Sequence, residues 1–275
     1  FCAAMERRLA VPTAIAAGCD IFLFNKDLDE DIRFMKEGIA NGILTPERID
    51  EAVTRILAMK AALHLPEKQT EARLVPPKED LAVLKGEKHV EWAKQAADNG
   101  ITLVKDTADN LPLRPEATPR LLLQVIGPYE EANTQITSTV IPLLEKAGFR
   151  VTLYQPEDFT TGFESVSQFR SKYDAVLYLA NVENRSNATT TRINWYTFFG
   201  QGNNIPWFVD EVPTVFASLG NPYHLMDVPM VKTYINTYDN HQAVIEALVA
   251  KILGKSDFKG VSPIDPYCGL MDARR

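Results

Sequence analysis

The sequence predicts an α/β protein, most of which forms a mostly parallel sheet with helices on both faces. Apolar runs of strand length alternate with helical patterns beyond residue 88; the runs cover residues 120–126, 150–154, 174–180, 215–219 and 230–235. The fourth run lies within PTVFASLGNPY, residues 213–223, between a proline and a Gly-Asn-Pro turn. A short apolar run bounded in this way favours a buried strand over a helix.

Composition and charge exclude several classes of protein. The 275 residues suit one large or two ordinary domains, and 45% hydrophobic with 24% charged residues is usual for a globular protein. With a net charge of -7 and no basic run, we expect no nucleic-acid partner. No apolar run reaches the roughly 18 residues that span a bilayer. Three cysteines without a CxxC or Cys-His cluster predict neither a disulfide framework nor a zinc site.

The first 65 residues predict one strand followed by two helices. Residues 20–24, DIFLF, have both faces apolar, as in a strand with neighbours on each side. Asp27 is the expected cap of a helix with an acidic first turn, which Gly42 ends. Thr45, followed by Pro46, predicts the start of the second helix.

A proline-rich charged stretch separates this region from the rest of the chain. Pro66, Pro76 and Pro77 lie among charged residues with little periodic apolar content, which predicts an extended linker. We therefore expect three parts, at residues 1–65, 66–87 and 88–275.

Residues 97–113, ADNGITLVKDTADNLPL, resemble the start of the second domain of glycoside hydrolase family 3, although that family usually has Ser at the position of Gly100. Residues 16–24 are similar to the eighth strand of the family's barrel, and residues 42–60 resemble its closing helices. Residues 218–223, SLGNPY, match a loop typical of the bacterial β-N-acetylhexosaminidase branch. The resemblance implies the last strand and helices of a (β/α)8 TIM barrel, followed by an αβα sandwich.

The resemblance also implies an activity and a missing part. The parent would be a retaining β-N-acetylhexosaminidase that hydrolyses terminal β-N-acetylglucosaminides, for example of peptidoglycan or chitooligosaccharide fragments. The family's nucleophilic Asp should fall just upstream of Phe1, and its His-Asp acid/base pair has no counterpart here. We therefore expect the chain to be inactive without the N-terminal barrel portion as its partner, with an amino-sugar glycoside as substrate.

Six residues are candidates for the neighbourhood of the substrate, because ligands collect beyond the carboxyl ends of parallel strands. Asn25 follows the barrel-type strand; Glu183 and Arg185 lie in the polar loop after residues 174–180; Asn221, Tyr223 and His224 follow residues 215–219. His224 and Asp227 are interpreted as a pair that structures their loop. No residue of the chain is predicted to be catalytic or to bind a metal.

Three alternatives stay open. In β-glucosidase members of the family a Glu of the second domain can be the acid/base, which would give Glu183 that role. The chain could instead be a non-catalytic sugar-binding module, or a doubly wound ligand-binding domain unrelated to hydrolases.

No nucleotide-binding or acidic calcium-loop motif occurs, so we expect no cofactor. No signal peptide opens the chain, which predicts a cytoplasmic protein, but its first residue, Phe1, indicates that the natural N-terminus is missing.

Overall fold

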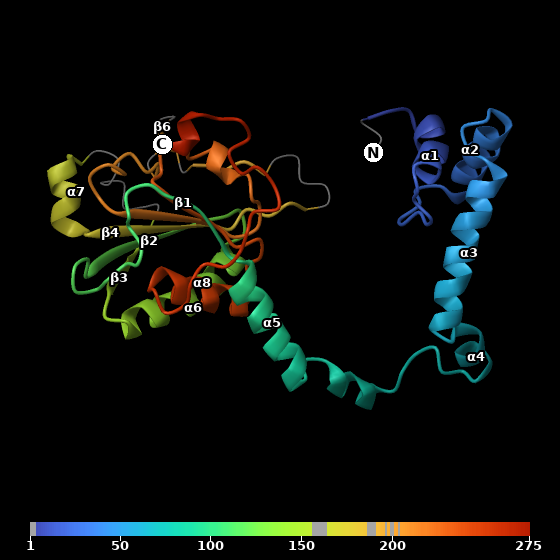
Figure 1. Ribbon diagram of the computed structural model, residues 1–275, viewed down its shortest axis with the longest axis horizontal. Coiled ribbons are helices and arrows are strands. Elements are labelled where there is room, and N and C mark those ends of the chain that lie inside the picture. Colours follow the sequence, from blue (N-terminus) through green and yellow to red (C-terminus); the bar gives the residue numbers. More distant parts are fainter. Residues whose placement is uncertain (1–3, 156–163, 186–190, 196, 199–200, 203) are drawn as a thin grey trace. The chain divides into compact units, whose positions relative to one another are not determined.

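The computed structural model describes residues 4–155, 164–185, 191–195, 197–198, 201–202 and 204–275 (Figure 1). The chain divides into two compact units, Phe1–Val83 and Leu84–Arg275. The division falls within the stretch for which the sequence predicts a linker. Each unit is described by itself.

The first unit is helical. Its helices are α1 (Arg7–Ala16), α2 (Leu28–Ala40), α3 (Pro46–Ala62) and α4 (Leu65–Thr70), followed by the 3-10 helix η1 (Lys78–Val83). The carboxylate of Asp27 accepts the N–H of Glu30 at 2.9 Å, and the hydroxyl of Thr45 accepts the N–H of Arg48 at 3.2 Å. These contacts satisfy N–H groups that the first turn of a helix leaves free. Both predicted helix starts are therefore confirmed.

The strand predicted at residues 20–24 is not formed. This segment is irregular, and the side chains of Leu23 and Phe24 are 76% and 98% exposed. A strand must pair its backbone N–H and C=O groups with a neighbouring strand. The described part of the first unit contains no strand with which this segment could form a ladder.

The predicted linker is only partly extended. Residues of α4 and η1 form short helical turns within it, where the sequence predicts an extended chain. No residue of these two elements is buried, so their packing contributes little to the stability of the first unit.

The second unit contains the predicted sheet. Its six strands lie in the order β1-β8-β7-β4-β2-β3, and all neighbours are parallel except β1 and β8. The strands are β1 (Thr102–Asp106), β2 (Arg120–Ile126), β3 (Arg150–Leu153), β4 (Ala175–Ala180), β7 (Thr214–Ser218) and β8 (Thr233–Asn236). A separate two-stranded ribbon pairs β5 (Thr197–Phe198) with β6 (Gln201–Gly202). Every residue of β4 and β7 is buried, as expected for central strands with continuous apolar runs.

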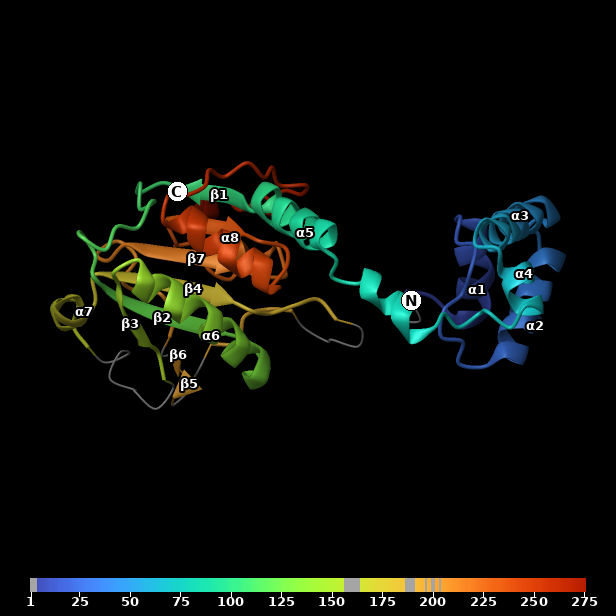
Figure 2. The same ribbon diagram turned by 90° about the horizontal axis from the view of Figure 1, so that it is seen from below.

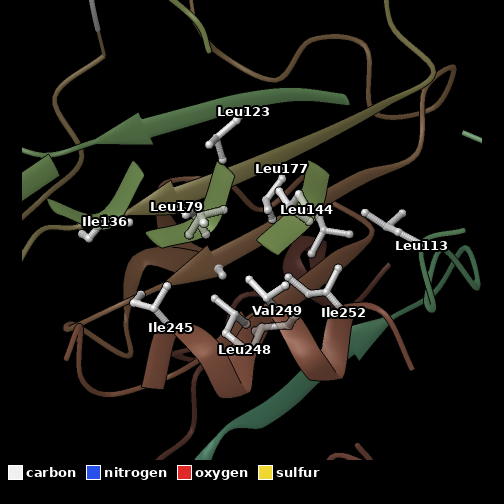
Figure 3. Packing of buried hydrophobic residues seen from close by; sticks show 14 of the residues in the cluster. Leu113, Leu123, Ile136, Leu144, Leu177, Leu179, Ile245, Leu248, Val249 and Ile252 are labelled. Carbon is white, nitrogen blue, oxygen red and sulfur yellow. The ribbon is translucent and has the colours of Figure 1, made fainter. Parts of the chain in front are cut away.

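Helices cover the two faces of this sheet unequally. Helices α5 (Glu87–Gly100), α6 (Glu130–Lys146) and α8 (Gln242–Ile252) lie together on one face (Figure 2). Figure 3 shows Leu248, Val249 and Ile252 of α8 pointing towards Leu177 and Leu179 of β4. The other face packs against α7 (Val166–Lys172) and irregular segments through a second apolar cluster. The predicted αβα arrangement with a mostly parallel sheet is confirmed.

A buried ion pair joins α8 to α5, and the segment after α8 is bound to the same two side chains. Lys251 has a side chain that is 0% exposed, and its ammonium donates to Asp98 at 3.0 Å and to the backbone oxygen of Asp257 at 2.6 Å. Asp98 also accepts from Lys259 at 2.7 Å. Hydrogen bonds from Lys259, Ser256 and Lys251 hold the pKa of Asp98 well below its usual value.

No helix in the described ranges is long and apolar enough to cross a membrane.

Candidate functional site

The carboxyl ends of β2, β4, β7 and β8 meet at one edge of the sheet, because these strands are parallel neighbours. The loops that leave this edge are polar. Their residues include Asn181 and Glu183 after β4, Asn221 after β7, and Asp239 and Asn240 after β8. Ligands of open parallel sheets bind beyond this edge, which makes it the candidate site.

Three asparagines form a continuous hydrogen-bonded chain along the edge. The Nδ2 of Asn133 donates to the carbonyl of Gly127 at 3.0 Å, and the Nδ2 of Asn181 donates to the Oδ1 of Asn133 at 3.0 Å. The Nδ2 of Asn240 donates to the Oδ1 of Asn181 at 2.9 Å and also to the Oε1 of Glu183. We call Asn133, Asn181 and Asn240 the asparagine chain. It connects the loops after β2, β4 and β8 and ends on a carboxylate.

Two glycines allow the loops to approach this closely. A Cβ at position 127 would lie 2.6 Å from the backbone oxygen of Asn181, and a Cβ at position 220 would lie 2.9 Å from the Cγ of Glu183. Gly127 therefore admits the backbone after β4, and Gly220 admits the side chain of Glu183.

Glu183 lines a hollow of about 340 Å³ at the edge. The other residues that line it are Asn184, Leu219, Gly220, Tyr238, Asp239, Asn240 and His241. The guanidinium of Arg185 lies 3.4 Å from a Glu183 carboxylate oxygen and stacks 4.0 Å above the ring of Tyr129. The two residues predicted in the polar loop, Glu183 and Arg185, thus contact each other.

Asp239 and His241 form a second polar pair beside the hollow. The Nδ1 of His241 lies 2.7 Å from the Oδ1 of Asp239, and the side chain of His241 is 82% exposed. Partial burial opposes ionisation of Asp239, but hydrogen bonds from His241 and from backbone N–H groups hold the pKa of Asp239 below its ordinary value. Sequence reasoning did not pair these residues, although an Asp-x-His pattern just before a helix was the available signal.

His224 lies in the interior of its loop. Its side chain is 1% exposed; Nδ1 lies 2.7 Å from the hydroxyl of Ser218, and Nε2 lies 2.7 Å from the backbone oxygen of Thr191. Burial lowers the pKa of His224. Asp227 instead accepts from the Nε of Arg192 and the backbone N–H of Ile193. His224 and Asp227 thus bind different residues. His224 contacts Ser218 and Thr191, whereas Asp227 contacts Arg192 and Ile193.

The remaining candidates lie in two separate places. Asn221 is buried and accepts the N–H of Tyr223 at 3.0 Å, while the side chain of Tyr223 is partly exposed. Asn25 belongs to the first unit, where it donates to Asp31 at 3.1 Å. Asp31 also binds Arg7. Among the side chains that the structure describes, no three His, Cys, Asp or Glu residues gather as a metal site would require.

Comparison with curated proteins shows a clear sequence similarity. The chain is 43% identical over 274 residues to a beta-N-acetylglucosaminidase/beta-glucosidase of Cellulomonas fimi. The match covers 98% of the chain and 48% of the relative. No family model matches the sequence.

Solved structures give the same relationship. Beta-glucoside phosphorylase BglX is 41% identical with a TM-score of 0.72, over 99% of the chain and 48% of that protein. A glycoside hydrolase family 3 beta-N-acetylglucosaminidase from Paenibacillus sp. shares the fold at 18% identity and a TM-score of 0.51, over 92% of the chain and 46% of that protein. The chain thus spans about half the length of these relatives. The chain is similar over almost its whole length to enzymes of glycoside hydrolase family 3, and its second unit has the αβα fold of the C-terminal domains of that family.

Proposed function

We propose that the chain is the C-terminal portion of a retaining β-N-acetylhexosaminidase. The observation that carries this proposal is the 43% identity, over almost the whole chain, to a protein named as a beta-N-acetylglucosaminidase/beta-glucosidase. The proposed substrates are terminal β-N-acetylglucosaminides of peptidoglycan or chitooligosaccharide fragments, and the proposed role is in the recycling of cell-wall sugars.

The proposed division of labour follows from the chemistry. Retaining hydrolysis needs a nucleophile and an acid/base roughly 5–5.5 Å apart on either side of the glycosidic bond. We assign both groups to the upstream half, so that the chain alone is inactive. At the sheet edge, Glu183 lines the hollow, accepts a hydrogen bond from Asn240 and contributes the carboxylate that contacts the sugar.

The upstream half is also the proposed partner of the first unit. Ile21, Leu23 and Phe24 are exposed apolar residues in a segment with strand-like sequence. Packing against strands of a longer protein would bury these side chains. The relatives, about twice as long as this chain, have room for such strands.

A second candidate is action on β-glucosides with phosphate as the acceptor. It is favoured by the 41% identity to a protein named beta-glucoside phosphorylase. The two reactions break the same kind of bond and differ in the oxygen that attacks the sugar. Water yields a free sugar, whereas phosphate yields a sugar phosphate. In the β-glucosidase alternative, Glu183 would be the acid/base.

The test uses the chain extended upstream through a complete barrel. The extended protein is assayed on a p-nitrophenyl N-acetyl-β-glucosaminide and on the matching β-glucoside, each with and without inorganic phosphate. We expect faster cleavage of the N-acetylated substrate and free N-acetylglucosamine as product. Faster cleavage of the glucoside, or a sugar phosphate as product, would favour the second candidate. An extended protein that binds these sugars without cleaving them would favour the non-catalytic module.

A further inference from the structure

We propose that the asparagine chain positions the carboxylate of Glu183 at the 340 Å³ hollow, where it accepts a hydrogen bond from a pyranose hydroxyl. In this proposal Asn133, Asn181 and Asn240 are positioning residues, and Glu183 is the residue that touches the sugar. The inference rests on the proposed function, since it takes a sugar as the ligand of this edge.

The groups at the two ends of the asparagine chain set the direction of its hydrogen bonds. The carbonyl of Gly127 only accepts, so Asn133 turns its Nδ2 towards Gly127 and leaves Oδ1 for Asn181. Asn181 in turn leaves its Oδ1 for Asn240. Asn240 therefore faces two acceptors, Asn181 and Glu183, and uses its two N–H hydrogens for them. Only a side chain with two donors fits position 240.

Glu183 is held by two partners and packs closely against a glycine. Asn240 donates to one carboxylate oxygen, and the guanidinium of Arg185 lies 3.4 Å from the other. Gly220 leaves room for the Cγ of Glu183, which a Cβ there would approach to 2.9 Å. A carboxylate that is fixed before binding loses less conformational freedom when a ligand arrives.

The hollow has the size and chemistry of a sugar subsite. About 340 Å³ lies near the lower end of the roughly 300–1,000 Å³ usual for ligand pockets, which suits a single sugar ring. Glu183 and Asp239 offer carboxylate acceptors to hydroxyl donors. Asn133 and Asn181 are not among the residues that line the hollow. Any effect of these two on a bound sugar must therefore pass through Asn240 and Glu183.

The test measures sugar binding by the 275-residue chain itself. Backbone amide signals of Asn184, Gly220 and His241 are followed by NMR while N-acetylglucosamine, and separately glucose, is added. We expect saturable shifts of these signals in the wild-type chain. Asn240→Asp removes both donors and is expected to raise the dissociation constant at least about tenfold. Asn133→Ala changes no lining residue and is expected to raise it by a smaller factor, about threefold.

Matched variants separate positioning from charge and from stability. Asn184→Asp adds the same charge to the hollow as Asn240→Asp without touching the asparagine chain, and is expected to weaken binding less. Gln135→Ala, two residues along α6 from Asn133, is expected to bind as the wild type does. Asn240→Gln keeps two N–H donors and should retain more affinity than Asn240→Asp. Thermal unfolding of each variant identifies any loss of fold.

Each outcome decides the inference. Saturable shifts that weaken in Asn240→Asp and Asn133→Ala support it. Sugar binding that is indifferent to both variants overturns the positioning role, and the absence of shifts at the hollow in the wild-type chain overturns the subsite. The proposed glycosidase activity is decided separately, by cleavage in the extended protein, so its failure is distinguishable from failure of this inference.

Discussion

At the scale of single residues, Asp98 illustrates how one carboxylate can hold a segment in place. It binds Lys251 of α8, whose side chain has no contact with solvent, and Lys259 in the segment after α8. Removing the carboxylate partner of a buried ammonium costs far more folding free energy than removing the partner of an exposed one. The buried charge is left uncompensated in a poorly polarisable interior.

We expect Asp98→Asn to lower the free energy of unfolding by about 3 kcal/mol, because Lys251 stays buried without a charged partner. Urea unfolding measures the change. Asp257→Asn is the matched control, since Asp257 contacts Lys251 only through its backbone oxygen among the hydrogen bonds described. Equal losses in the two variants would contradict the role given to Asp98.

His224 gives a prediction of pH dependence. Its pKa is lowered by burial in the folded chain, while in the unfolded chain it takes up a proton near the ordinary value of about 6.5. The unfolded state therefore binds more protons below that pH, and stability is lost as the pH falls from about 7 towards the folded pKa.

Removing this imidazole should flatten the pH profile. We expect unfolding midpoints of His224→Gln to change less between pH 7 and 5 than those of the wild type, as measured by denaturant titration at each pH. His64→Gln, at an exposed position whose side chain makes no cap hydrogen bond to its helix, should keep the wild-type profile. A His224→Gln profile as steep as the wild type would show that other groups cause the loss.

At the scale of elements, the sequence predicted those helices and strands that depend on contacts between residues close together in the chain. Asp27 and Thr45 predict the starts of α2 and α3, because the side chain of a cap accepts a hydrogen bond from an N–H three residues further along the chain. The central strands β4 and β7 were predictable because strands buried on both faces are continuously apolar. Residues 20–24 carry the same pattern, but strand formation depends on neighbours that this chain does not contain among its described residues.

The candidate site was only partly predictable for the same reason. Glu183 and Arg185 were found because they follow a recognisable strand. Asn133 and Asn240 were not, since their partners lie 48 and 59 residues away in sequence and no local pattern marks them. Their role follows only from the meeting of strand ends in space.

The glycine at the end of β2 carries a prediction at this scale. Gly127→Ala would place a Cβ 2.6 Å from both the backbone oxygen of Asn181 and the Oδ1 of Asn133. Because the backbone cannot yield cheaply, we expect a loss of about 1–3 kcal/mol in unfolding free energy. Gly100→Ala, where no atom lies within 4 Å of the added Cβ, should be neutral or slightly stabilising. Equal stability of the two variants would refute the close packing at Gly127.

At the scale of the whole molecule, the two units differ in how completely they bury their apolar residues. The second unit encloses two apolar clusters around its sheet, whereas the first unit exposes Leu23 and Phe24. In the isolated chain we therefore expect the amides of Leu23 and Phe24 to exchange with solvent almost as fast as in an unfolded peptide. Hydrogen exchange measures this, with β4 and β7 as protected internal references. Strong protection of Leu23 and Phe24 would mean that this segment has already found a partner, such as a second copy of the chain.

We propose that this chain supplies the C-terminal portion of a glycosidase whose catalytic groups lie upstream. The most direct measurement is the release of p-nitrophenol from an N-acetyl-β-glucosaminide by three samples: this chain, the separately produced upstream half, and the two combined. We expect turnover only in the combined sample, together with new protection of the amides of Leu23 and Phe24. Turnover by this chain alone would contradict it, because the nucleophile and the acid/base would then lie within these 275 residues.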